Sequence, residues 1–264
     1  MRFPALTILA VLLIGAVPAT AADQAVPLAA HRALYQLTLE QARGADVAAA
    51  SGTMAYEVLD ACEGWATRQR LEMTVTNRDG QDIQMLSDYT TWESKDGLSM
   101  RFRMRQTTES AVTSEVAGEA SLERTGGPGE VRYSLPEESK KALPAGTLFP
   151  MAHTEAILAA AHEGKSFITL PLFDGTSEKG AQDSTVAIVH WAGPKAGKWP
   201  DLSSLSSGRV HVAFFDRDAG TQQPDYEVGM RYWDNGVADD LSMDFGDFVM
   251  KGTLAKLEVL RPGC

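Results

Sequence analysis

The stretch that decides the fold reads Met100-Arg101-Phe102-Arg103-Met104-Arg105, in which large apolar side chains alternate with arginines. Successive side chains on a β-strand point to opposite faces of the sheet, so this pattern places the apolar residues on one face and the arginines on the other. A helix would scatter the same residues around its circumference. The stretch therefore predicts a half-buried strand with its apolar face against a core.

The same alternation recurs along the chain after residue 30, and turn-forming residues such as Arg78-Asp79-Gly80 and Asp234-Asn235-Gly236 separate the alternating runs. Many strands joined by hairpin turns are typical of a mostly antiparallel barrel, sandwich or curled sheet. We expect about fourteen strands, over residues 30–40, 52–60, 63–76, 81–93, 98–107, 110–118, 119–124, 129–135, 165–171, 184–192, 207–216, 224–232, 237–244 and 248–260.

Two runs and two segments depart from simple alternation. The runs Val186 to Val189 with Trp191, and Val212 to Phe215, are apolar on both faces and predict central strands that are covered on both sides. Segments 136–147 and 193–208 are rich in Pro, Gly, Ser and Lys and are predicted to be linkers.

Residues 150–163 predict one α-helix, because Pro150 stands at its start and Gly164 follows its end. A single amphipathic helix in a β-protein most simply covers the concave face of the sheet. Its expected apolar side comprises His153, Thr154, Ile157, Leu158, Ala160 and Ala161.

The N-terminus has the layout of a cleavable secretory signal. Arg2 precedes an apolar run from Ala5 to Val17, Pro18 breaks that run, and Ala19-Thr20-Ala21 supplies small residues for cleavage. We expect residues 1–22 to be a signal peptide and residues 23–264 to form a single domain in the periplasm. A division into two lobes near residue 140 is the alternative.

Composition argues against several classes of partner. The formal net charge is −11, and removal of a signal that holds Arg2 and no acid gives −12. Such a surface repels nucleic acid and anionic lipid headgroups. No later segment has 18 consecutive apolar residues, so no membrane span is expected in the mature protein. We also expect the protein to be a monomer.

The expected export of the protein bears on how its two cysteines, Cys62 and Cys264, are interpreted. In an oxidising compartment an even cysteine count indicates a disulfide, whereas two free thiols are the alternative. A bridge would close a loop of about 200 residues and tie down the last residue of the chain. We expect it to be structural, without redox chemistry.

Catalytic motifs are not visible in the sequence, so no enzyme, metal or cofactor is expected. Arg101, Arg103 and Arg105 could grip an anionic ligand or an acidic partner, or they could form a solvated face paired to cross-strand acids. His153, beside Ile157, is a weaker candidate for a ligand or partner contact and has the pattern of a partly buried histidine. Some methionines could line an adaptable cavity or pack in an ordinary core, namely Met54, Met73, Met85, Met100 and Met104.

Seven short motifs follow one another in order along the chain. They are Leu28-Ala29-Ala30-His31-Arg32-Ala33-Leu34-Tyr35-Gln36-Leu37, Ser51-Gly52 with Ala61-Cys62-Glu63-Gly64-Trp65, Gly146-Thr147-Leu148-Phe149-Pro150-Met151-Ala152-His153-Thr154, Leu172-Phe173-Asp174-Gly175, Pro224-Asp225-Tyr226-Glu227, Asn235-Gly236-Val237 and Cys264. Together they resemble the cell envelope integrity protein EipB family, long classed as a domain of unknown function. Ala30 departs from the family's usual proline, and Trp199-Pro200 is displaced from the usual position.

The resemblance implies a mainly β, single curled and spiral-like antiparallel sheet that wraps one central helix, with a disulfide between Cys62 and Cys264. This architecture is similar to that of periplasmic lipoprotein carriers. It also implies a non-enzymatic role, without a cofactor, in maintaining the cell envelope under stress. We expect the protein to act by binding an envelope protein or peptide; the alternative is a carrier of a lipid or lipoprotein acyl chain. An unrecognised hydrolase has little support beyond the histidines.

Overall fold

A computed structural model describes residues 27–44, 46–217, 223–261 and 263–264. The expected signal peptide, residues 1–22, lies outside the described residues. Within the described chain, no helix combines the length and the apolar character needed to cross a bilayer.

The described residues form a 14-stranded antiparallel sheet built from two meanders. The first meander comprises β1 (His31–Ala42), β2 (Val47–Asp60), β3 (Gly64–Asn77), β4 (Asp82–Ser94), β5 (Ser99–Thr108), β6 (Ala111–Leu122), β7 (Gly129–Leu135) and β8 (Ser139–Leu143). The second comprises β9 (Phe167–Leu172), β10 (Gln182–Ala192), β11 (Ser207–Asp216), β12 (Tyr226–Trp233), β13 (Ala238–Asp244) and β14 (Phe248–Val259). A short 3-10 helix, η1 (Pro200–Leu202), lies between β10 and β11.

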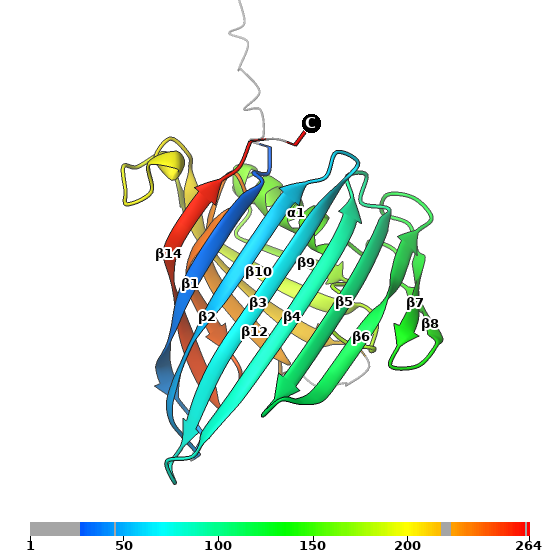
Figure 1. Ribbon diagram of the computed structural model, residues 1–264. Helices are drawn as coiled ribbons and strands as arrows, with labels where there is room; N and C mark the ends of the chain where they lie inside the picture. Colours follow the sequence, from blue (N-terminus) through cyan, green and yellow to red (C-terminus); the bar gives the residue numbers. More distant parts are fainter. Residues whose placement is uncertain (1–26, 45, 218–222, 262) are drawn as a thin grey trace, which may run out of the picture.

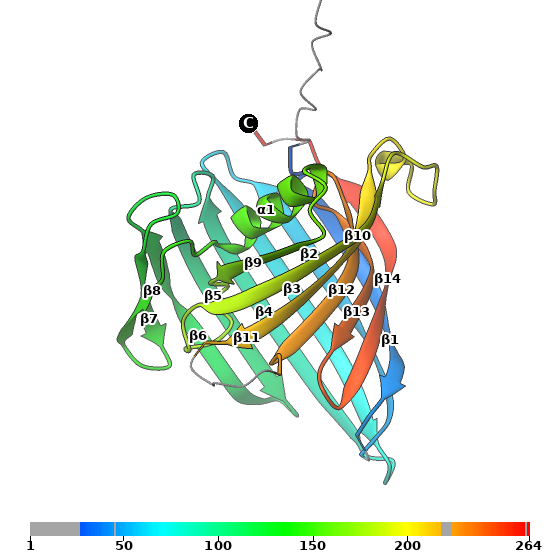
Figure 2. The same cartoon turned by 180° about the vertical axis from the view of Figure 1, so that it is seen from behind.

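The strand order explains how the two meanders become one sheet. The order is β8-β7-β6-β5-β4-β3-β2-β1-β14-β13-β12-β11-β10-β9, so β1 and β14 are neighbours near the middle and β8 and β9 are the two edges. Figures 1 and 2 show the sheet curling, so that β9–β12 lie behind β2–β5. The expected single curled sheet around one helix is confirmed.

The predicted strand count is matched through two compensating errors. The predicted strands 110–118 and 119–124 are one strand, β6, which runs through Gly118. A Cβ at Gly118 would lie 2.2 Å from the carbonyl oxygen of Arg132, so the glycine marks close packing of β6 on β7 and not a break. The predicted linker 136–147 contains β8, an edge strand whose Lys140 and Lys141 are exposed, as is usual where a sheet ends.

The expectation of strands covered on both sides is wrong for 186–189. Val186 and Ile188 are buried, but Val189 is 47% exposed, because successive side chains of β10 alternate and Val189 points to the face opposite Val186 and Ile188. The run 212–215 is likewise covered mainly on one side: Val212 is buried and Phe215 is half-buried.

Helix α1 (Pro150–His162) ends one residue before the predicted helix and fixes the interior of the curl. Its buried residues are Met151, His153, Ile157, Leu158, Ala160 and Ala161, which is nearly the expected face. No side chain caps its N-terminus locally. Instead Glu93 of β4 accepts the backbone N–H groups of Met151 and Ala152 at 2.8 and 2.9 Å, replacing the usual cap with one from the sheet.

Candidate functional site

The interior of the curled sheet contains a cavity of about 470 Å³. Its walls are inward-facing residues of β1–β5 and of β10–β13, and the first turns of α1 close one side. The lining residues are Leu28, Ala29, His31, Tyr35, Met54, Tyr56, Val58, Gln69, Leu71, Ser87, Met104, Gln106, Met151, Thr154, Asp174, Thr176, Gln182, Phe214, Tyr226, Val228, Met230, Tyr232, Asn235, Gly236, Ala238, Leu241, Met243 and Phe245. The surface that faces the cavity is mostly apolar, although nine polar side chains and four tyrosine hydroxyls belong to this set of residues.

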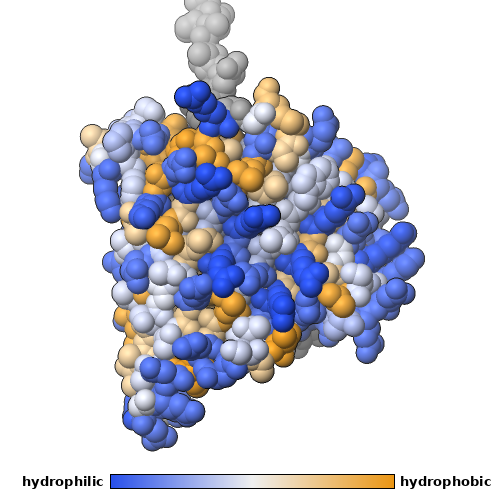
Figure 3. Space-filling view, viewed as in Figure 1, coloured by the Kyte–Doolittle hydropathy of each residue, from blue (hydrophilic) through white to orange (hydrophobic). Residues whose placement is uncertain are grey.

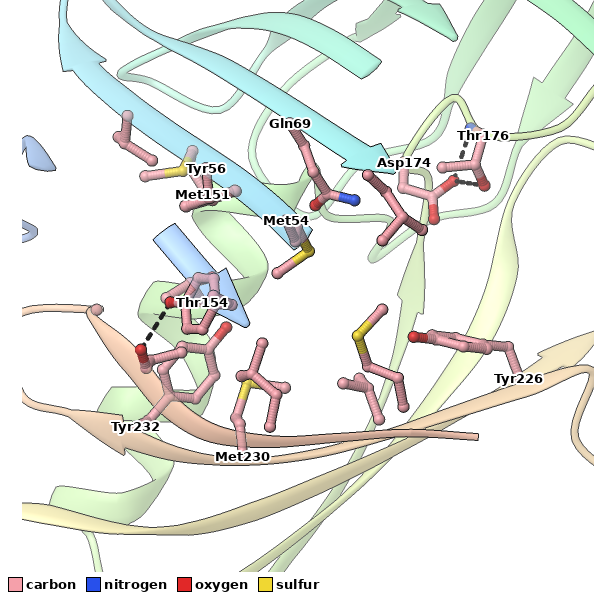
Figure 4. Close-up of a pocket in the computed structure, with 18 of the residues that line it drawn as sticks. Met54, Tyr56, Gln69, Met151, Thr154, Asp174, Thr176, Tyr226, Met230 and Tyr232 are labelled. Atoms are coloured by element: carbon pink, nitrogen blue, oxygen red, sulfur yellow. Dashed lines mark hydrogen bonds between the residues drawn. The ribbon is translucent and has the colours of Figure 1, made fainter. Parts of the chain in front are cut away.

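Methionines contribute to opposite walls of the cavity, as Figure 4 shows for Met54, Met151 and Met230. The thioether side chain is unbranched and polarisable, so these residues can adapt to apolar guests of different shape. Of the five methionines predicted as lining candidates, Met54 and Met104 line the cavity. Met73 and Met100 pack in the core and Met85 is 41% exposed.

Four tyrosines, Tyr35, Tyr56, Tyr226 and Tyr232, place hydroxyl groups among these apolar walls. Tyr35 donates its hydroxyl hydrogen to the carbonyl of Ala238 at 2.7 Å, and Tyr232 is hydrogen-bonded to Thr154 of α1. Burial raises the pKa of all four phenols, so each stays protonated at neutral pH. They give the cavity polar positions without charge.

Asp174 supplies a carboxyl group at the end of the cavity opposite Tyr232 (Figure 4). Its Oδ1 accepts the backbone N–H and the hydroxyl of Thr176 at 2.9 and 2.8 Å, and its Oδ2 accepts the Gln182 amide at 3.0 Å. Burial raises the pKa of Asp174, and these hydrogen bonds oppose that shift. The position is set by Gly175, whose φ of 71° and contact with Phe102 exclude a larger residue.

His31 is the one histidine among the described residues of the lining and is 3% exposed. Its Nδ1 lies 2.8 Å from the carbonyl oxygen of Ala29, which can only accept, so Nδ1 carries the proton. Burial lowers the pKa of His31, which keeps the imidazole neutral. Its Nε2 is then an acceptor, and it has no hydrogen-bond partner within the described chain.

The structure places His153 in the packed core and not in the cavity lining. His153 is 6% exposed, and its Nε2 donates to the Ser184 hydroxyl of β10 at 2.7 Å, which in turn donates to the Leu170 carbonyl at 2.9 Å. Burial lowers the pKa of His153 to about 4, so it is neutral. It attaches α1 to β10, as Glu93 attaches the same helix to β4, and a ligand or partner contact for His153 stays a prediction.

Arg101, Arg103 and Arg105 lie on the outer face of β5, because Met100 and Phe102 point inward. Arg101 pairs with Glu119 at 3.3 Å and Arg103 pairs with Glu115, both on the neighbouring β6. Arg105 lies in register between Asp88 and Glu115. These arginines face away from the cavity, on the outer wall where hydrophilic residues predominate (Figure 3), and match the solvated-face interpretation. A role for the three arginines in binding a partner stays a prediction.

The Cys62–Cys264 disulfide is present, with a Cα–Cα distance of 5.6 Å. It joins the turn after β2 to the segment after β14, across β1. It therefore crosses the junction of the two meanders, beside the wall of the cavity.

Sequence reasoning missed Asp174, His31 and the four tyrosines as site residues. Two signals were available: Asp174 lies in the Phe173-Asp174-Gly175 turn and His31 in the first family-like motif. Neither motif shows that the side chains share a cavity, because they come from segments more than 140 positions apart.

Comparison with known proteins agrees with this architecture. The EipB-like family model matches residues 22–261. The chain is 33% identical over 257 residues to the cell envelope integrity protein EipB of Brucella abortus (strain 2308), covering 93% of this chain and 89% of that protein. A crystal structure of a β-barrel-like protein with a domain of unknown function (DUF1849), also from Brucella abortus, superposes with a TM-score of 0.80 at 31% identity, covering 90% of this chain and all of the other. The chain belongs to the EipB-like family.

Proposed function

We propose that this protein supports the integrity of the cell envelope as a non-enzymatic periplasmic binding protein. In this proposal its concave cavity holds an apolar chain, such as the acyl chain of a lipid or lipoprotein. The observation that carries the proposal is the cavity of about 470 Å³ with its mostly apolar lining. A volume of this order is typical of sites for small molecules.

The envelope role is supported by the matched relative, which is named a cell envelope integrity protein. The periplasmic location is supported by the signal-like N-terminus and by the two cysteines, which are paired as in proteins of oxidising compartments. The lining itself favours an apolar guest, because methionine and tyrosine side chains from both meanders meet there.

Native mass spectrometry of the protein purified from periplasm tests the proposal. We expect a co-purifying acyl species on the unmodified protein. Val228→Trp places a large ring in the cavity lining and should remove that species, whereas Val112→Trp, at a position that is 49% exposed and outside the lining, should retain it. An unmodified protein that is empty, and that takes up no added lipid, would exclude the carrier function.

The second candidate is the binding of an extended peptide of an envelope protein, which one edge of the sheet favours. Phe167 at the start of the edge strand β9 is 60% exposed, and Val189 of the adjacent β10 is 47% exposed. A sheet edge with exposed apolar side chains can accept an added strand.

Cross-linking in cells from position 189, on the adjacent β10, tests this second function. We expect a cross-link to one envelope protein, which Phe167→Asp weakens and the matched Val112→Asp does not. A cross-link pattern identical for all three proteins would remove the edge as a partner site.

A further inference from the structure

The described side chains that line the cavity include one acid but no cationic group. Among the described residues that line it there is no lysine or arginine, and Asp174 is the one carboxylate. His31 is a neutral acceptor at Nε2, and the remaining polar groups are uncharged amides and hydroxyls. The lining thus offers uncharged donors and acceptors together with one acid, Asp174, within a protein whose overall charge is −11.

Asp174 has capacity for a further hydrogen bond. Its Oδ1 already accepts two donors from Thr176, while Oδ2 accepts one, from Gln182. A carboxylate oxygen accepts two hydrogen bonds comfortably, so Oδ2 retains one position. The hydrogen bonds from Thr176 and Gln182 favour the charged form of the group against the burial that raises its pKa, and an ammonium beside Oδ2 would favour that form further.

His31 marks a second acceptor, contributed by β1. Its ring lies 5.7 Å from that of Tyr56, which also lines the cavity, and its Nε2 lacks a partner within the described residues. A buried acceptor without a donor is costly, and a ligand that donates a hydrogen bond removes that cost.

We propose that the cavity selects an amphiphile whose polar group donates hydrogen bonds, with an ammonium group favoured over a hydroxyl, and that it rejects carboxylates and phosphates. Asp174 is the residue that determines this specificity. The inference rests on the proposed function, because it requires an apolar chain in the cavity.

The physical reason is the partial burial of Asp174. An ammonium that reaches Oδ2 gains a charge-assisted hydrogen bond, which is stronger than the bond that a hydroxyl would make. A carboxylate or phosphate would instead lose its hydration beside a like charge, with no cationic side chain of the lining to compensate.

A series of head groups on the unmodified protein tests the inference without any substitution. Nile red serves as a neutral reporter, and dodecylamine, dodecan-1-ol, dodecanoate and dodecyl phosphate displace it at neutral pH, each below its micellar concentration. We expect dodecylammonium to bind about tenfold more tightly than the alcohol, and both anions to bind more weakly than the alcohol. Equal or tighter binding of dodecanoate would overturn the inference.

Asp174→Asn should bring the affinity for dodecylammonium to within about twofold of that for dodecanol, with the affinity for dodecanol unchanged. Asp88→Asn is the matched control, since Asp88 lies on the outer face, where it pairs with Arg70 at 3.0 Å. A melting curve checks that each variant is folded, and the series on the unmodified protein decides the matter if Asp174→Asn is not.

The outcomes separate this inference from the proposed function. Binding of dodecanol without a preference for the amine, or an Asp174→Asn variant that keeps the preference, overturns the specificity alone. If neither Nile red nor any of the four amphiphiles binds, the proposed function fails and the specificity fails with it.

Discussion

The two ends of the curled interior differ: one is filled and the other is hollow. Under β5–β7 four rings pack edge to face, with the centroids of Phe102 and Phe173 5.2 Å apart and those of Phe149 and Phe173 6.3 Å apart. Tyr133 completes the group at 5.8 Å from Phe102. Between β1–β4 and β12–β13, by contrast, strands of the same alternating pattern leave the cavity of about 470 Å³.

The difference shows that segments outside the strands determine whether side chains fill the interior of the curled sheet. Phe149 and Phe173 are fully buried, yet neither lies on a strand: one precedes α1 and the other follows β9. Segments that cross the interior therefore fill the packed end. At the hollow end the crossing element is the first part of α1, which contributes Met151 and Thr154 to the lining and leaves space beside them.

The largest expected effect is at the packed end. Phe173→Ala should lower the free energy of unfolding by about 3–5 kcal/mol, because it leaves a void among rings that are close-packed. Phe245→Ala, at a half-buried ring that lines the cavity, should cost roughly half as much. Urea unfolding of both variants measures the comparison, and equal losses would mean that the two ends are packed alike.

Removal of the disulfide should loosen the hollow end in preference to the packed end. Cys62→Ser should cost about 3 kcal/mol, because the bridge closes a loop between residues separated by 202 positions. Hydrogen exchange should rise first in β1, β2 and β14, which the bridge holds together, and later in β5–β7. The Cys264 thiol of the variant should react with maleimide, whereas labelling of the unmodified protein without reductant would contradict the bridge.

Glu93, which attaches α1 to β4, should make stability depend on pH. Burial raises its pKa from 4.5 to about 7, although the two N–H donors of the helix oppose the shift. The folded protein therefore holds a proton that the unfolded chain releases between about pH 4.5 and 7. Stability from this group is present below pH 4.5, falls as the pH rises to about 7, and then stays constant, a loss of about 3 kcal/mol.

The measurement is the difference in unfolding free energy between the unmodified protein and Glu93→Gln across that pH interval. Glu119→Gln, at an exposed position on the outer face, is the control and should give a flat difference. A flat difference for Glu93→Gln as well would show that this carboxyl titrates alike in both states.

The smallest expected changes in stability come from removing single tyrosine hydroxyls, one at each end of the interior. At the packed end the Tyr133 hydroxyl accepts the Gly180 N–H at 3.1 Å and donates to the Ser177 carbonyl at 3.2 Å, so Tyr133→Phe should cost about 1 kcal/mol. Tyr226→Phe, in the cavity lining, should change stability by less than about 0.5 kcal/mol. Calorimetric melting of both variants gives the ranking, and a larger loss for Tyr226→Phe would reverse the comparison.

The sequence carries most of the strand pattern, because a half-buried strand must alternate. Strand β8 was not predicted, because an exposed edge strand with Lys140 and Lys141 has no alternating apolar face. Strand β6 was predicted as two strands, because Gly118 resembles a break between them. The cap on α1 could not be predicted, because Glu93 lies 58 positions from Met151. The cavity escapes prediction for a related reason: an inward Met54 at the hollow end and an inward Phe102 at the packed end occupy equivalent places in the alternation.

The pairing of β1 with β14 has a consequence for how the protein must fold. His31 pairs with Val259, and most of the chain lies between these partners. The second meander can form its hairpins early, since each joins neighbours along the chain, but β1 gains its second neighbour only when β14 arrives. Contacts between such distant positions slow folding, because the entropy of closing a long loop is lost before the contact is gained. The sheet is thus completed from its middle, and until then the inner face of β1 that later borders the cavity is open to other proteins.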